Sequence, residues 1–223
     1  MKKSLVAGAV LLVSTSMLSG CVIHVGNANA MEGSDFSSIL GNIDIAAGKH
    51  AGDISSVNGN VEISEGGSAD EVSIVNGNLN MEGHVTVGSV DIVNGDITAT
   101  THLTILDNME SVNGNIQIPN HSNIGGSIET VNGDIEIANS VVKNNIETVS
   151  GDIALRGVTH VVGDIVFHNT ESSWGAFSDD KPTLTIGQDV TIDGNIILER
   201  PVTLELENDA LHQKVVVSYS SAK

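Results

Sequence analysis

Seven glycines recur through most of the chain at intervals of 18 or 19 residues, and this period constrains the fold more than any other feature. Each lies in an apolar-Asn-Gly-Asn/Asp-apolar context or a close variant of it. The members are Gly41, Gly59, Gly77, Gly95, Gly114, Gly133 and Gly151. Self-similarity at a fixed period of this length is typical of solenoids, in which each repeat forms one coil and stacks on its neighbours.

Residues at equal offsets from these glycines form columns, because they lie above one another when coils stack. Three columns are apolar in every coil, at the positions two before, two after and four after the glycine. In the coil of Gly114 they are Val112, Ile116 and Ile118. Polar residues such as Gln117 separate the last two, so the segment alternates with period two. We therefore expect all three columns to belong to a strand with one buried face.

Two weaker apolar pairs complete each coil, for example Val85 with Val87. Three short apolar faces about six residues apart predict a triangular cross-section, with strands one coil apart paired in parallel. The chain has only three prolines, so the hydrogen-bond ladders between strands can continue unbroken. No segment with helical periodicity of useful length follows the first 21 residues. The sequence thus predicts an all-β fold, a single-domain parallel β-helix. Right-handed winding is preferred for parallel crossovers, although an 18-residue triangular coil also suits left-handed helices.

Asparagine precedes the repeat glycine in five consecutive coils, and serine replaces it in the sixth. The column comprises Asn58, Asn76, Asn94, Asn113, Asn132 and Ser150. Such a row could present ligands to solvent. We favour a structural ladder at a corner, where Asn tolerates positive φ and stacked amides hydrogen-bond between coils.

The N-terminus is typical of an export signal. A positively charged end precedes an apolar run from Leu5 to Val13, which is too short to span a membrane as a mature helix. The run leads to Leu18-Ser19-Gly20-Cys21, which resembles the lipobox of bacterial lipoproteins. The resemblance implies that residues 1–20 are a signal peptide and that Cys21 becomes the acylated first residue of the mature protein.

Val22 follows the cysteine and is not an inner-membrane retention signal under lipoprotein sorting rules. The resemblance therefore implies an outer-membrane anchor, facing either the periplasm or the cell exterior. Cys21 is the only cysteine, which excludes an intramolecular disulfide and a cysteine-based zinc cluster. Residues 21–37 are rich in Gly, Asn and Ser and predict a lipidated tether, followed by the β-helix domain at 38–223.

The charge balance excludes one class of partner. Beyond the leader, seven basic residues stand against 28 acidic ones, a formal charge of −21. This field repels nucleic acids and anionic lipid surfaces, so we expect no nucleic-acid partner. High negative charge is typical of a soluble exported domain or of one that attracts divalent cations.

Two columns are acidic. One lies four residues before the repeat glycines and contains Asp91, Glu110, Glu129 and Glu147. The other follows the glycines and contains Asp96, Asp134 and Asp152, with Asn115 in the gap. Stacked carboxylates about 5 Å apart repel by about 1 kcal/mol per pair in water, and Ca²⁺ would relieve either column. The calcium-binding nonapeptides of other solenoids are absent, and we favour a solvated charged face.

Histidine shows a comparable register. His84, His102 and His121 each lie seven residues after the glycine of their coil. Two imidazoles one coil apart could share a zinc ion, with a carboxylate or water completing a tetrahedron. We favour a stacked surface ladder, and we expect no bound metal or cofactor.

The repeat is interrupted near residues 168–182, which we interpret as a loop insertion. It contains Phe177 and the only tryptophan, Trp174. Non-repetitive loops often carry the binding surface of a solenoid, which makes these two residues the candidates for a binding site. The interpretation we favour is that the aromatic rings close a gap against the stack. Strand-like alternation resumes at Leu184.

The repeated Val-Asn-Gly-Asp/Asn-Ile-x-Ile units, as in Val131 to Ile137, resemble the bacterial adhesin-type β-strand-repeat family of envelope β-helices. This similarity spans residues 39 to about 166, while the later short-strand coils bear a looser similarity to polymer-forming bactofilins. The first resemblance implies a non-enzymatic, lipid-anchored structural or adhesive module of the cell envelope. Its partner would be an envelope protein or polysaccharide.

Two alternatives are a metal-binding envelope protein that uses the histidine and acidic columns, and a polysaccharide-active β-helix enzyme. The chemistry of such enzymes needs clustered acids with a base or arginine, and sugar binding needs aromatic platforms. The chain has two arginines, Arg156 and Arg200, and 2% aromatic residues, so the enzyme is the less favoured alternative.

Overall fold

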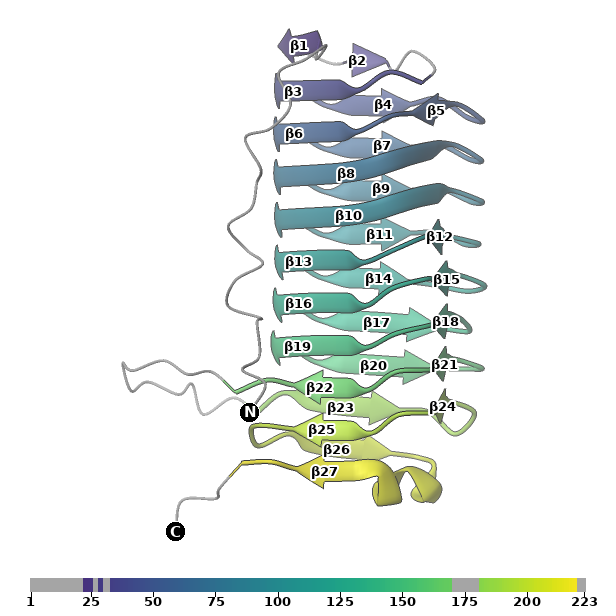
Figure 1. Cartoon of the computed structure of the whole chain (residues 1–223), viewed down its shortest axis with the longest axis vertical. Helices are drawn as coiled ribbons and strands as arrows, with labels where there is room; N and C mark the ends of the chain where they lie inside the picture. Colours follow the sequence, from purple (N-terminus) through teal and green to yellow (C-terminus); the bar gives the residue numbers. More distant parts are fainter. Residues whose placement is uncertain (1–21, 26–27, 30–32, 170–180, 220–223) are drawn as a thin grey trace, which may run out of the picture.

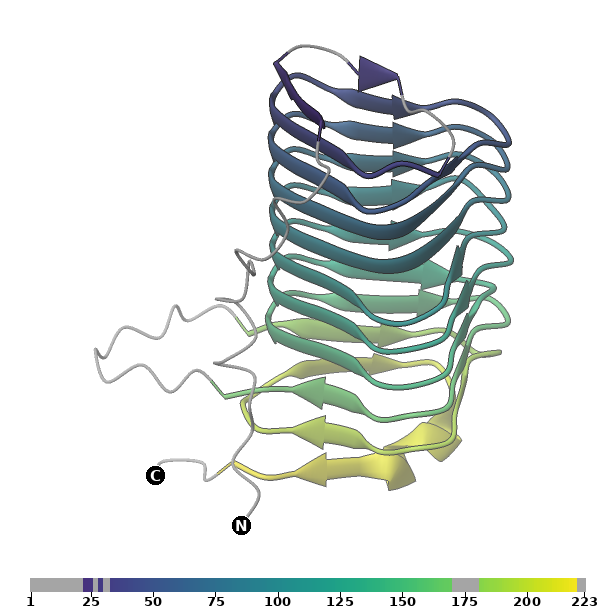
Figure 2. The same ribbon diagram turned by 45° about the horizontal axis from the view of Figure 1, so that its top comes forward.

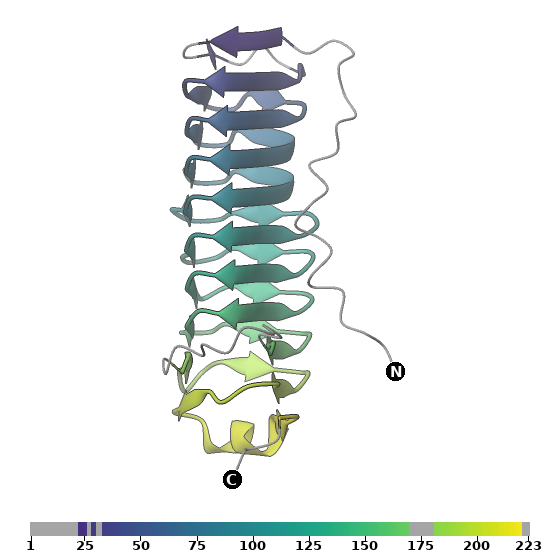
Figure 3. The same cartoon turned by 90° about the vertical axis from the view of Figure 1, so that its left-hand side faces the viewer.

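The computed structural model describes residues 22–25, 28–29, 33–169 and 181–219, and it shows a parallel β-solenoid (Figure 1). In that view the nearer strands run from right to left and the farther strands from left to right while the chain descends, and Figure 3 agrees. The winding is therefore right-handed. The all-β, parallel β-helix prediction is confirmed.

One face is a ten-stranded parallel sheet with one strand from each coil. Its strands are β2 (Ala28–Asn29), β4 (Ile43–Ile45), β7 (Val61–Ile63), β9 (Leu79–Met81), β11 (Ile97–Ala99), β14 (Ile116–Ile118), β17 (Ile135–Ala138), β20 (Ile153–Arg156), β23 (Thr183–Ile186) and β26 (Thr203–Leu206). Ile97, Ile116 and Ile135 are paired in register and fully buried, whereas Gln117 is exposed. The period-two prediction holds for these strands.

The other strands form a 17-stranded sheet with two columns. The longer column contains β1 (Val22–Val25), β3 (Phe36–Leu40), β6 (Ile54–Asn58), β8 (Ser68–Asn76), β10 (Thr86–Asn94), β13 (Met109–Asn113), β16 (Ile128–Asn132), β19 (Ile146–Ser150), β22 (Ile165–Phe167), β25 (Ile196–Leu198) and β27 (Val215–Val217). The shorter contains β5 (His50–Ala51), β12 (Thr104–Ile105), β15 (Asn123–Ile124), β18 (Val141–Val142), β21 (His160–Val161) and β24 (Thr191–Ile192). The long strands β8 and β10 pass through both columns and so join them into one sheet.

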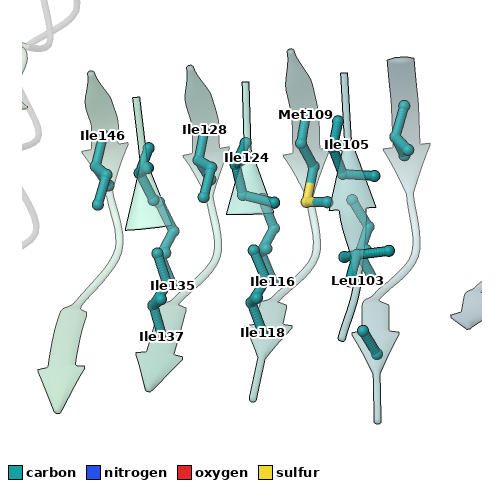
Figure 4. Packing of buried hydrophobic residues seen from close by; sticks show 14 of the residues in the cluster. Leu103, Ile105, Met109, Ile116, Ile118, Ile124, Ile128, Ile135, Ile137 and Ile146 are labelled. Carbon is teal, nitrogen blue, oxygen red and sulfur yellow. The ribbon is translucent and has the colours of Figure 1, made fainter. Parts of the chain in front are cut away.

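The two sheets enclose a continuous aliphatic interior. In Figure 4, Ile116 and Ile118 from one sheet point toward the space occupied by Ile124 and Met109 from the other. These four side chains are at most 1% exposed. Figure 2, in which the top of the molecule is turned forward, shows the strands of successive coils stacked along the solenoid. Burial of this aliphatic interior is the main source of stability of the solenoid, because each coil covers the apolar surface of the next.

The apolar column two residues before the repeat glycine does not face this interior, contrary to expectation. Val112 is half-buried, while Ile39 and Val57 are 47% and 41% exposed. The inward positions are three and five residues before the glycine, as at Ser111 and Met109. Two residues, Gly114 and Asn115, separate β13 from β14. The inward-facing Ser111 and Ile116 are therefore five positions apart, an odd number, and the alternation changes phase at the corner. We call the outward column the outer apolar row: Ile39, Val57, Val75, Val93, Val112, Val131 and Val149.

The corner glycines are required by close approach between coils. A Cβ added at Gly114 would lie 1.9 Å from the carbonyl oxygen of Gly95, and one at Gly133 would lie 2.0 Å from that of Gly114. No side chain fits at such distances. The repeat glycine is therefore the residue that lets the coils stack at strand spacing.

Strand pairing begins early in the described part of the chain. β1 pairs with β3 and β2 pairs with β4, so strand pairing extends into residues 21–37, the expected tether. At the other end, the 3-10 helix Asp209–Lys214 (η2) places Leu211, 4% exposed, against the core. The Asn208 side chain caps this helix by accepting a hydrogen bond from the Ala210 N–H. In the described residues no helix is long and apolar enough to cross a membrane.

Candidate functional site

The predicted lipidation and loop residues cannot be placed. Cys21, Trp174 and Phe177 lie outside the described residues. The extra residues near 168–182 do fall within one coil, since Ile153 of β20 pairs with Leu184 of β23, 31 positions later. Other coils of the regular repeat are 18 or 19 residues long.

The histidine row occupies a corner with left-handed backbone conformation. His84, His102 and His121 have φ values of 61°, 52° and 63°. Asn139 follows in the same column with a φ of 46°, and the coils on either side place glycines there, at Gly66 and Gly157. Glycine and asparagine adopt this conformation most easily, and histidine is enriched in it relative to most other residues. The column is explained by backbone geometry.

The three rings stack on one another. The ring centroids of His84 and His102 are 4.5 Å apart with an interplanar angle of 19°, and those of His102 and His121 are 5.2 Å apart at 29°. A zinc ion lies close to the plane of each imidazole that binds it, so near-parallel stacked rings do not converge on one ion. Among the described residues, no three His, Cys, Asp or Glu side chains are grouped so as to hold a metal ion. The geometry favours the ladder over a shared metal.

The asparagine column is a hydrogen-bonded ladder. The Asn94 side-chain N–H₂ donates to Asn76 Oδ1 at 3.0 Å, Asn113 donates to Asn94 at 3.0 Å, and Asn132 donates to Asn113 at 3.0 Å. The ladder continues up to Asn58. Each amide satisfies its neighbour in the next coil, which supports the structural interpretation.

The second acidic column also has a structural role. Asp96 Oδ1 accepts the backbone N–H of Asn115 at 2.8 Å, and Asp134 Oδ1 accepts that of Asp152 at 2.9 Å. Asn115 does the same for Asp134, which explains why an amide replaces a carboxylate there without a gap. One oxygen of each side chain therefore caps the backbone of the following coil.

The first acidic column is different because its carboxylates repel one another. Asp91, Glu110, Glu129 and Glu147 are aligned in register on β10, β13, β16 and β19. Burial, together with the neighbouring Glu147 and Glu110, raises the pKa of Glu129 to about 7. Burial and the nearby Glu110 and Glu71 raise the pKa of Asp91 to about 6. These side chains retain protons that an exposed carboxyl would release.

This column continues diagonally toward the N-terminal coils. Glu71 lies near Asp91 and also near Asp53, whose pKa is raised by burial and by Asp35, Glu71 and Asp70. We call the continuous row the acidic stripe: Asp53, Glu71, Asp91, Glu110, Glu129 and Glu147. Its upper end borders an open hollow of about 620 Å³ lined by Asp53, Asp70, Glu71, Gly88, Ser89, Leu106 and Asp107.

The lower end of the stripe meets a histidine that sequence reasoning missed. His168 Nε2 lies 2.7 Å from Glu147 Oε2, and His168 Nδ1 lies 3.2 Å from Glu199 Oε2. The His168 and Glu147 side chains are only 11% and 16% exposed. Hydrogen bonding to Glu147, and then to Glu199, raises the pKa of His168, while the same bond lowers the pKa of Glu147. Both ring nitrogens of His168 thus face carboxylates, an arrangement that favours the imidazolium form.

Both nitrogens of His168 are occupied, so the ring has no free position for a substrate proton or a metal. Its chemical role is electrostatic, to neutralise the end of the stripe. The contact was not apparent from the sequence because Glu147 and His168 belong to different columns, and because Glu199 follows only after the enlarged coil. The 31-residue pairing of Ile165 with Ile196 brings the region of Glu199 next to that of His168.

Comparison with known proteins adds no family or function. No protein-family model, no curated protein and no solved structure matches this chain.

Proposed function

We propose that this protein is a lipid-anchored, non-catalytic module of the bacterial cell envelope, in which a rigid β-solenoid serves a structural or adhesive role. The observation that carries the proposal is the use of the repeated polar columns. Those of asparagine and aspartate connect one coil to the next by hydrogen bonds, and the histidine row fills a left-handed corner. Repeated polar residues of this kind build an extended scaffold.

The anchor is proposed from the lipobox at Leu18–Cys21, and the outer membrane from the residue that follows it. A metal-binding role receives less support, because the stacked rings of His84, His102 and His121 do not converge. An enzymatic role receives less support from the buried His168, because both of its nitrogens are already hydrogen-bonded.

Cys21→Ser tests the anchor. We expect the wild-type protein to remain in washed membranes and the variant to leave them, because the proposed lipid chain would supply the membrane anchor. Fractionation followed by immunoblotting measures this, with Ser19→Ala as a control that keeps the cysteine. Retention of Cys21→Ser in washed membranes would show that lipidation is not the anchor.

Protease treatment of intact cells then separates the two envelope settings. An adhesive role requires cleavage of the solenoid from outside, whereas a periplasmic structural role requires protection until the outer membrane is permeabilised. Cleavage only in lysed spheroplasts, with the protein in the cytosolic fraction, would exclude both roles.

A further inference from the structure

The acidic stripe lies beside the outer apolar row, which is half-buried along most of its length, on the same outward face of the longer strand column. Members of the stripe such as Glu110 and Glu129 lie two residues before Val112 and Val131 on the same strands. Residues two apart on a strand point to the same side. The face therefore presents carboxylates and aliphatic side chains in adjacent parallel rows along the solenoid.

Over most of its length, this face has few ion pairs within the part of the chain that the structure describes. Within the described residues, no lysine, arginine or histidine forms an ion pair with Asp91, Glu110 or Glu129. Among the ion pairs of the described residues, the one that reaches the stripe joins Glu147, at its lower end, to His168. Partial burial and the neighbouring carboxylates make Asp91 and Glu129 costly to ionise. Cations supplied from outside would offset that cost and complement the charge of the face.

We propose that the acidic stripe and the outer apolar row together form the docking surface for an extended basic segment of a partner polypeptide. This inference rests on the proposed adhesive role and gives the chemical class of its partner. Lysine or arginine side chains would lie over the carboxylates and apolar side chains over the valines. Neither row alone specifies this ligand, because a free cation needs no apolar row and an apolar peptide needs no carboxylates.

The dimensions suit such a segment. Coils are stacked about 4.8 Å apart, so the four carboxylates from Asp91 to Glu147 span about 14 Å. An extended chain rises about 3.3 Å per residue, so four or five residues cover that span with side chains alternating between two directions. Several basic residues would thus contact the stripe at once.

The hollow at the upper end of the stripe provides a deeper contact. Gly88 forms part of its wall, where a Cβ would lie 2.0 Å from the carbonyl oxygen of Asp70. The carboxyl-bearing residues Asp53, Asp70 and Asp107 line it, and Leu106, also in its lining, is 65% exposed. A long basic side chain can place its charged group among carboxylates while its methylene stem contacts an apolar residue. The hollow thus fits the side chain of a terminal lysine or arginine.

Binding of a fluorescein-labelled peptide of alternating lysine and valine to the full-length protein in non-ionic detergent tests the proposal. Fluorescence anisotropy at pH 8 should detect binding that weakens with added NaCl. The double variant Glu110→Gln/Glu129→Gln should weaken it at least tenfold, since two contacting charges are removed. Val112→Ser/Val131→Ser should also weaken binding, while a large dependence on salt remains.

The matched control is Glu62→Gln/Glu65→Gln, which removes the same charge from β7 and the turn that follows it, on the other sheet. It should change affinity by less than twofold. An equal loss of affinity in Glu110→Gln/Glu129→Gln and in this control would overturn the proposal. The absence of detectable binding to the wild type would also overturn it. Displacement of the peptide by Ca²⁺ but not by Na⁺ at equal ionic strength would make the stripe a cation site and overturn it as well. The assay in detergent is independent of the anchor and of cell-surface exposure, so its failure is distinguishable from failure of the proposed function.

Discussion

At the scale of single residues, backbone conformation decides which side chains the corners accept. The column of Gly66, His84, His102, His121, Asn139 and Gly157 shares positive φ values, although its side chains differ widely in chemistry. Spacing in the sequence was sufficient to predict that the three histidines lie in one row. It did not reveal the left-handed conformation, which is the physical reason that histidine alternates there with asparagine and glycine.

Substitution of His102 tests this explanation. His102→Val should lower the free energy of unfolding by about 1–2 kcal/mol, because a β-branched residue is strained at positive φ. His102→Asn should cost much less, since asparagine tolerates that conformation. Urea denaturation followed by circular dichroism measures both variants. Equal stability of the two would mean that ring stacking, rather than backbone conformation, determines the residue at this corner.

At the scale of the strand and its corner, the sequence predicts the alternation better than its phase. Ile116 and Ile118 were correctly expected on one face of a strand, whereas Val112 was expected to be buried and is not. The period of two is visible within each strand, but the number of residues in the corner sets the relation between strands. The length of the corner depends on how closely Gly114 approaches Gly95 of the preceding coil. This approach is a property of the stacked coils and is not visible in the sequence of one coil.

Replacement of glycines by alanine separates the corner from ordinary turns. Gly114→Ala should lower the free energy of unfolding by about 3 kcal/mol or more, because its Cβ would collide with the carbonyl oxygen of Gly95 and two coils would have to separate. Gly83→Ala is the matched control, since its Cβ would meet only Thr101 Cγ2 at 3.5 Å. Similar thermal midpoints for the two variants would refute the proposed packing of the corners.

At the scale of the whole molecule, the acidic stripe makes stability depend on pH. The raised pKa values of Glu129 and Asp91 mean that the folded protein binds these protons more tightly than the unfolded chain does. Their contribution to the free energy of unfolding is complete below the ordinary carboxyl pKa values. It is lost as the pH rises through about 6 to 7, the pKa values of these groups in the folded protein. His168, whose pKa is also raised, contributes below its ordinary value of 6.5, and this contribution is lost as the pH rises through its folded pKa. Glu147 acts oppositely, since its contribution is lost as the pH falls through its lowered pKa.

We therefore expect maximum stability in mildly acidic solution and a lower thermal midpoint at pH 8. Glu129→Gln should raise the free energy of unfolding at pH 8 by about 1–2 kcal/mol after allowance for solvent screening, and should have little effect at pH 5. Glu62→Gln, on the other sheet, is the matched control that removes one carboxylate away from the stripe. Thermal denaturation across this range provides the measurement, and a wild-type midpoint that rises steadily from pH 5 to pH 8 would contradict the expectation.

The asparagine ladder gives the solenoid an electrical direction. Each side-chain amide donates toward the preceding coil, so the dipoles of Asn76, Asn94, Asn113 and Asn132 all point the same way along the axis. Their positive ends face the N-terminal coils and their negative ends the C-terminal ones. Ser150 continues the column beyond Asn132, and the guanidinium of Arg200 donates to its hydroxyl and to the carbonyl of Val149. A cation thus lies at the negative end of the row, as it would at the C-terminus of an α-helix, in a protein whose described residues contain almost no helix.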